Sequence, residues 1–97
     1  MKIINESNFN EEIAVGKVLV DFYADWCGPC KMLLPVLEES EEKIGIPIKK
    51  VNVDESTSIA REYGVMTIPT LILFDNGKEI KRNVGFVNVQ ELEEFVN

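Results

Sequence analysis

The sequence lacks histidine altogether and contains only two cysteines. The missing histidine excludes a Cys–His nucleophile of the protease type, because that nucleophile needs an adjacent imidazole as its base. A structural zinc site normally takes four protein ligands, most often cysteine and histidine. One copy of this chain cannot supply such a set, so a cysteine zinc site could form only between two chains.

Positive charge is also scarce, and long apolar runs are missing. The chain has 10 Lys and Arg against 17 Asp and Glu, which gives a formal net charge of −7. This balance argues against nucleic acid and anionic membranes as partners. No apolar run approaches the roughly 20 residues of a membrane span, and residues 1–5 are too few and too quickly polar for a signal peptide. We therefore expect a cytoplasmic protein, in a compartment where a disulfide is more often catalytic than structural.

The residues that are present suffice for one domain. A chain of 97 residues is near the most common domain size, and its 45% hydrophobic residues can build a core without disulfides. We expect a single domain over residues 1–97. The two cysteines need not be structural, although a pair of packed structural cysteines stays an alternative.

Strand-like and helix-like segments alternate along the chain. Strands are expected over residues 2–4, 18–23, 46–53, 70–74 and 79–84. Helices are expected after a Ser7 cap, over residues 27–44 and 56–63, and after an Asn88–Glu91 cap pair. This alternation implies right-handed crossovers and a mainly parallel sheet with helices on both faces. The Asn76-Gly77 turn adds an antiparallel hairpin at its edge.

Both cysteines fall in one short motif, Trp26-Cys27-Gly28-Pro29-Cys30, between a strand and the long helix. Positions three apart on a helix face lie about 5–6 Å apart at Cβ, which is close enough to bridge with modest adjustment. Cys27 would meet the unpaired N–H groups and positive dipole end of the helix, which favour a thiolate. Gly28 keeps the approach to sulfur open, Pro29 stiffens the first turn, and Cys30 points inward. The motif predicts thiol–disulfide chemistry.

Asp21 interrupts the apolar strand six residues before Cys27. An acid in this place either reaches water at the strand end or is buried. Burial would raise its pKa, because loss of solvation disfavours the charged form. The residues alone leave both readings open.

From end to end, the chain resembles the thioredoxin family. The motifs that carry the resemblance are Val20-Asp21-Phe22, Trp26-Cys27-Gly28-Pro29-Cys30-Lys31, Ile68-Pro69-Thr70 and Val84-Gly85-Phe86. The resemblance implies the α/β thioredoxin fold. That fold has a central mixed sheet of about five strands, mainly parallel with an antiparallel C-terminal hairpin, flanked by four helices.

The resemblance also implies a function, the reduction of disulfides in target proteins by reversible oxidation of the dithiol to a Cys27–Cys30 disulfide. Cys27 would be the attacking thiol and Cys30 the resolving thiol. Asp21 would be a buried carboxylate that shuttles a proton for Cys30, with Lys50 near it. A thioredoxin reductase would restore the dithiol of a monomer that needs no bound cofactor or metal.

A docking surface around the cysteines is implied as well. The Ile68–Pro69 bond would be cis and would present the Ile68 backbone to an extended substrate, as in strand addition. The expected substrate-binding residues are Trp26, Gly28, Pro29, Thr67, Ile68, Pro69, Val84 and Gly85.

Two departures from the family concern partner preference rather than chemistry. Tyr23 stands where many relatives have a second tryptophan, and Phe86 is bulkier than the small residue that some have there. The rival reading is a binding module that uses the surface between Trp26 and Pro69 only to dock a partner. The intact cysteine pair argues against that reading.

Overall fold

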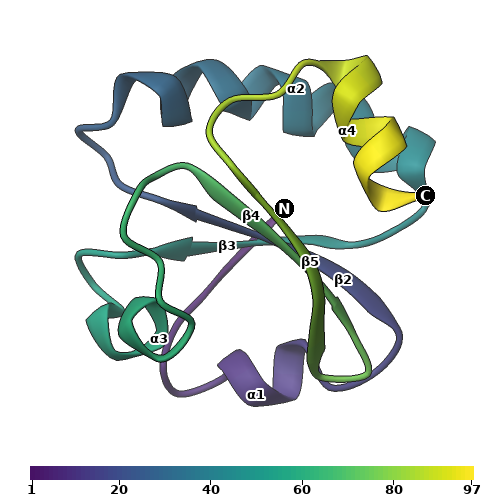
Figure 1. Ribbon diagram of the computed structural model, residues 1–97. Coiled ribbons are helices and arrows are strands. Elements are labelled where there is room, and N and C mark those ends of the chain that lie inside the picture. The colour runs from purple at the N-terminus through teal and green to yellow at the C-terminus, as the bar shows by residue number, and fades with distance from the viewer.

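The computed structural model describes residues 1–97 and places a five-stranded sheet between two layers of helices (Figure 1). The strands are β1 (Lys2–Ile4), β2 (Lys17–Tyr23), β3 (Ile48–Asn52), β4 (Thr70–Asp75) and β5 (Lys78–Val84). The helices are α1 (Phe9–Glu12), α2 (Gly28–Ile44), α3 (Thr57–Glu62) and α4 (Val89–Val96). The predicted fold class, with a mixed sheet of five strands and four flanking helices, is confirmed.

The sheet has the order β1-β3-β2-β4-β5. Strands β1, β3 and β2 pair in parallel, whereas β4 runs antiparallel to both β2 and β5. The antiparallel part therefore begins one strand earlier than the alternation of elements predicted. The six residues of α3 make only about 9 Å of helix, too short to carry the chain back along the sheet. Because Asn52 and Thr70 both lie at the carboxyl end of β2, β4 enters from that end and runs the opposite way.

Two apolar layers hold the sheet between the helices. One cluster joins Val20 and Phe22 of β2 to Phe9 of α1 and Ile59 of α3. The other joins Leu19 of β2 to side chains of α2 and α4, among them Leu33, Leu37, Leu92 and Val96. Successive strand residues point to opposite faces. Both faces of β2 are covered, so apolar residues occupy both faces and only Asp21 interrupts the run from Val18 to Tyr23. Burial of each large side chain contributes about 1.5–3 kcal/mol.

The end of the long helix and the start of the last helix follow the sequence prediction. Gly45 closes α2 with φ of 65°, a left-handed conformation that glycine adopts without a Cβ clash. Asn88 and Glu91 form the predicted capping box of α4. The Gly45 cap ends α2, the helix that has Cys27 at its N-cap and Cys30 in its first turn.

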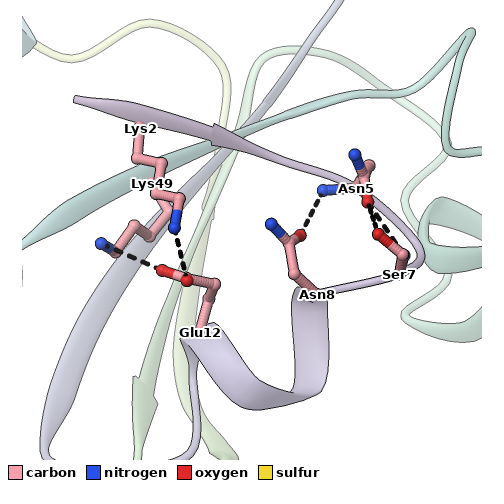
Figure 2. A network of polar contacts seen from close by, with 6 residues as sticks. All are labelled: Lys2, Asn5, Ser7, Asn8, Glu12 and Lys49. Carbon is pink, nitrogen blue, oxygen red and sulfur yellow. Dashed lines mark hydrogen bonds and ion pairs between the residues drawn. The ribbon is translucent and has the colours of Figure 1, made fainter.

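The first helix differs in its cap, as Figure 2 shows. Phe9 and Ile13 are buried as expected, but the Ser7 cap is wrong, because the Ser7 N–H and hydroxyl both donate to Asn5 Oδ1. An ion-pair network instead fastens α1 to the sheet. The Glu12 carboxylate lies 2.6 Å from Lys2 Nζ and 3.3 Å from Lys49 Nζ. The Lys2 hydrogen bond is the main cause of the lowered pKa of Glu12.

Ser40, on α2, is fully buried, and its hydroxyl has no hydrogen-bond partner. A buried unpaired hydroxyl costs about 1–3 kcal/mol, and alanine is the better helix former. We expect Ser40→Ala to raise the free energy of unfolding by about 1 kcal/mol, measured as a higher urea midpoint with an unchanged slope. The matched control is Ser58→Ala, which removes a hydroxyl that donates to Glu6 and should lower the midpoint. A lower midpoint for Ser40→Ala would show that its hydroxyl is paired in solution.

Candidate active site

The two cysteines lie where β2 passes into α2. Cys27 is the N-cap residue of α2 and Cys30 lies in its first turn. They are joined by a disulfide, with Cα atoms 5.2 Å apart, inside the usual range for a bridged pair. The backbone N–H of Cys30 donates to Cys27 Sγ over 3.2 Å. The helix N-terminus therefore supplies a hydrogen-bond donor to the sulfur that is expected to become a thiolate.

An apolar setting surrounds the disulfide. Cys27 is 4% exposed and Cys30 is 6% exposed. The cysteines pack with Ala24, and Tyr23, Val53 and Ile68 pack against this cluster. Cys30 is buried, in agreement with the expectation that it points inward, but Cys27 is equally buried, so burial does not distinguish the two cysteines. The difference between them is position, because only Cys27 caps the helix.

Asp21 is buried on the face of β2 that α2 covers. It follows Leu19 by two residues, so both side chains point to the layer that contains Leu33 and Leu37. Its residue exposure is 1%, and its Oδ1 has no hydrogen-bond partner. Burial raises the pKa of Asp21 to about 7, and the positive charge of Lys50 partly opposes that rise. The sequence left open whether Asp21 reaches water or is buried, and the structure shows that it is buried.

Lys50 lies opposite Asp21 on the neighbouring strand β3. Its Nζ stands 4.2 Å from the centre of the Tyr23 ring. Lys50, Tyr23 and Cys30 also line one cavity of about 140 Å³, together with Ala24, Asp25, Lys31 and Leu34. The structure therefore brings the expected lysine to the side of the fold that holds Asp21 and Cys30.

Two segments distant in sequence meet beside Cys27. The Ile68–Pro69 bond is cis, and the Ile68 carbonyl oxygen lies 3.8 Å from Cys27 Sγ. The N–H of Gly85 donates to the Pro69 carbonyl over 2.8 Å, which joins the end of β5 to this loop. Gly85 has φ of 100°, a conformation that favours glycine.

Residues 1–97 match the protein family Thioredoxin. The chain belongs to the thioredoxin family. It is 50% identical to a thioredoxin of Chlamydia caviae, with 100% of this chain and 96% of the relative covered. It is 46% identical to a thioredoxin of Bacillus subtilis, with 95% and 90% covered. A solved structure, that of a mutant thioredoxin from Halobacterium salinarum, is 36% identical with a TM-score of 0.90, covering 98% of this chain and 86% of that one.

These thioredoxin relatives and the Cys27–Cys30 pair identify the chain as a protein-disulfide oxidoreductase. No helix has the length and apolarity needed to cross a membrane. No group of three or more His, Cys, Asp or Glu residues is placed to hold a metal ion.

The other residues expected to bind substrate in this thioredoxin-family protein lie in the first turn of α2, in the loop before β4 and at the end of β5. Gly28 and Pro29 separate the cysteines in α2. Thr67 accepts a hydrogen bond from Thr70 Oγ1 over 2.5 Å, which ties its carbonyl to the start of β4. Val84 precedes Gly85 at the end of β5 and is 58% exposed.

Trp26 has a partner that sequence reasoning missed. The residue is 69% exposed, and its Nε1 donates to Asp54 Oδ2 over 2.8 Å. Asp54 comes two residues after β3 ends. Because parallel strands end at the same edge of a sheet, the parallel pairing of β2 and β3 was the signal that could have placed this acid beside the motif.

Removal of the Asp54 carboxylate should free the Trp26 ring. Trp26 is the only tryptophan, so its fluorescence reports on this one side chain. We expect Asp54→Ala to lower the fluorescence anisotropy and increase acrylamide quenching, while stability falls by only about 1 kcal/mol because the contact is exposed. Asp25→Ala, which removes a neighbouring exposed acid, is the control and should change neither signal. Equal anisotropy in Asp54→Ala and the parent protein would contradict the prediction.

Proposed function

We propose that this protein reduces disulfides in target proteins, with Cys27 as the attacking thiol and Cys30 as the resolving thiol. The observation that carries the proposal is the placement of Cys27 Sγ at the N-cap of α2, where it accepts the Cys30 N–H. A thiolate there is favoured over a thiol by the backbone donor and the helix dipole. A disulfide to Cys30 needs no change of helix position, since the pair is bridged in this structure.

The reaction consists of two thiol–disulfide exchange steps. The Cys27 thiolate attacks one sulfur of the target disulfide, a mixed disulfide forms, and the other target sulfur leaves as a thiolate that takes up a proton. Cys30 then loses its proton and attacks Cys27 Sγ, which releases the first target sulfur. The target gains two electrons and two protons, and the protein is left with the Cys27–Cys30 disulfide.

Asp21 is proposed as the group that accepts the Cys30 proton. A general base is most effective when its pKa lies near the working pH, and burial raises the pKa of Asp21 to about 7. The unpartnered Oδ1 supports this role, because a lone pair is left unused by the protein. Lys50 is proposed as the supporting cation of Asp21.

The target is proposed to lie along the Ile68 backbone, in contact with Trp26 and with the segments that flank Pro69 and Gly85. Support comes from the position of Ile68 beside Cys27 Sγ and from the exposed Trp26 and Val84 side chains. The full set of proposed contacts is Trp26, Gly28, Pro29, Thr67, Ile68, Pro69, Val84 and Gly85. Each reaction consumes the dithiol, so we propose that a thioredoxin reductase restores it in the cytoplasm, with the protein acting as a monomer without a bound cofactor.

A single-turnover assay tests the proposal. Reduced protein, freed of reductant, is mixed with insulin, and new insulin thiols are counted while the protein is followed by mass spectrometry. One target disulfide should be reduced per molecule of protein, and the protein should lose two hydrogen atoms. Protein with alkylated cysteines is the control. Absence of insulin thiols above that control, with insulin still bound, would favour a binding module, and zinc in the purified protein would favour the metal-bridged dimer.

A further inference from the structure

Lys50 of β3 has two possible partners for its ammonium group, the Tyr23 ring and the Asp21 carboxylate. Tyr23 follows Asp21 by two residues on β2, so both side chains project to the same face, and Lys50 stands opposite Asp21 on β3. The Lys50 ammonium lies over the Tyr23 ring, 4.2 Å from its centre. Asp21 Oδ1 has no hydrogen-bond partner. The lysine therefore contacts the ring and not the carboxylate.

This contact lies beside the cysteines. Tyr23 packs against the cluster formed by Ala24, Cys27 and Cys30. Tyr23 and Lys50 also line the cavity of about 140 Å³ that Cys30 borders. A change in where the ammonium stands therefore changes the charge next to the resolving thiol and its proposed proton acceptor.

We propose that Tyr23 is a positioning residue whose ring holds the Lys50 ammonium beside the Cys30 cavity, and so sets the electric field at Asp21 while Cys30 attacks. The inference rests on the proposed role of Asp21 as proton acceptor. It gives a role to Tyr23, which stands where many relatives have a second tryptophan.

The physical argument concerns the freedom of the lysine side chain. A lysine has a flexible four-carbon stem and a strongly hydrated ammonium, which moves toward water unless a contact holds it. The face of an aromatic ring supplies such a contact through its negative quadrupole. Held there, the ammonium favours the carboxylate form of Asp21 and opposes the effect of burial. Released into water, it would favour that form less, and the pKa of Asp21 would rise.

The other ionisable groups of the cavity are Asp25, Cys30 and Lys31. Asp25 and Lys31 are both exposed, carry opposite charges and stay unchanged when Tyr23 is replaced. Lys50 is the charged group that opposes the rise in the pKa of Asp21 caused by burial. The ring can therefore reach Asp21 electrostatically through Lys50.

The test compares three single variants by NMR titration of the Asp21 carboxyl carbon in the reduced protein. Lys50→Met removes the charge and should produce the largest rise in the Asp21 pKa of the three variants. Tyr23→Leu removes the ring and should produce roughly half or more of that rise, since the ammonium loses the contact that holds it. Tyr23→Phe keeps the ring and removes only the hydroxyl, so the pKa should match the parent. The pH midpoint of the resolving step should shift in the same order.

A double variant separates positioning from a change in burial. In the Lys50→Met background, Tyr23→Leu should add no further rise, because the group through which the ring acts is gone. A further rise there, or an unchanged or lower pKa in Tyr23→Leu alone, would overturn the proposal.

The parent protein provides a check that needs no variant. The ε-methylene protons of Lys50 should be shifted upfield by the Tyr23 ring, and ordinary shifts would overturn the proposal. If the shifts and pKa values behave as expected but the resolving rate does not follow the Asp21 pKa, the proton-acceptor role fails while the positioning of Lys50 stands.

Discussion

Cys27→Ser is expected to abolish disulfide reduction. A serine hydroxyl stays protonated near neutral pH and forms no mixed disulfide, whereas Cys27 Sγ receives a backbone hydrogen bond at the start of α2 that favours a thiolate. The Cys30 thiol that remains lies in the first turn without the N-cap position. The single-turnover insulin assay should give no thiols above the alkylated control.

Cys30→Ser should still attack the target disulfide but should fail at the resolving step. Cys27 still attacks, but no resolving thiol remains, so the protein should accumulate as a mixed disulfide with its target. This species is seen as a heavier band on a non-reducing gel and disappears with dithiothreitol. The Cys27→Ser and Cys30→Ser double variant is the control and should form no such band. If limited alkylation of the reduced parent at neutral pH modified Cys30 before Cys27, the two roles would be reversed.

Asp21→Asn is expected to stabilise the protein above neutral pH. The pKa of Asp21 is raised from 3.8 to about 7 in the folded protein, so the folded state binds the proton more tightly than the unfolded state. A stability penalty therefore builds as the pH rises through this interval and levels off above the folded pKa. This difference corresponds to up to about 4 kcal/mol at high pH. The gain in the variant is reduced by the cost of burying an amide that lacks partners.

The pH dependence of that gain distinguishes the carboxylate from other effects of the substitution. Urea midpoints of the oxidised proteins should differ little at about pH 4 and increasingly in favour of Asp21→Asn up to about pH 8. Asp25→Asn, which changes an exposed acid in the same segment, should keep the pH dependence of the parent. A variant that is less stable than the parent at high pH would show that Asp21 is an ordinary hydrated residue.

The same substitution should slow the resolving step. An asparagine cannot accept the Cys30 proton, and a positioned base contributes about 10²–10⁴-fold to such a transfer. Rapid-quench measurement of the mixed disulfide should show normal formation and delayed decay, with the loss most severe near neutral pH. Decay at the parent rate would show that water or the target takes the proton.

Much of the fold follows from local patterns in the chain. The apolar run 18–23 predicted a strand covered on both faces, and β2 is buried between the two helix layers. Asn76-Gly77 predicted the β4–β5 hairpin, and Asn88 with Glu91 predicted the start of α4. These predictions succeed because turn chemistry, capping and the period of two or about 3.6 residues act over a few neighbouring residues.

The resemblance to thioredoxins depends on equally local motifs. Cys27 and Cys30 are close because the chain between them is short, and the first turn of a helix fixes their spacing. The chemistry of the pair could therefore be predicted before any tertiary contact was known.

Only the tertiary structure decided what surrounds that pair. The burial of Asp21 depends on α2 lying over β2, and the contact of Lys50 with Tyr23 depends on the register of β3 against β2. The bond from Trp26 to Asp54 and the reversed direction of β4 depend on how distant segments meet at one edge of the sheet. The sequence determines which side chains are present and where local residue patterns favour turns and helix caps. The electric field at each charged group depends on residues that are distant in the sequence. The positions of these residues are determined only when the helices pack on the sheet.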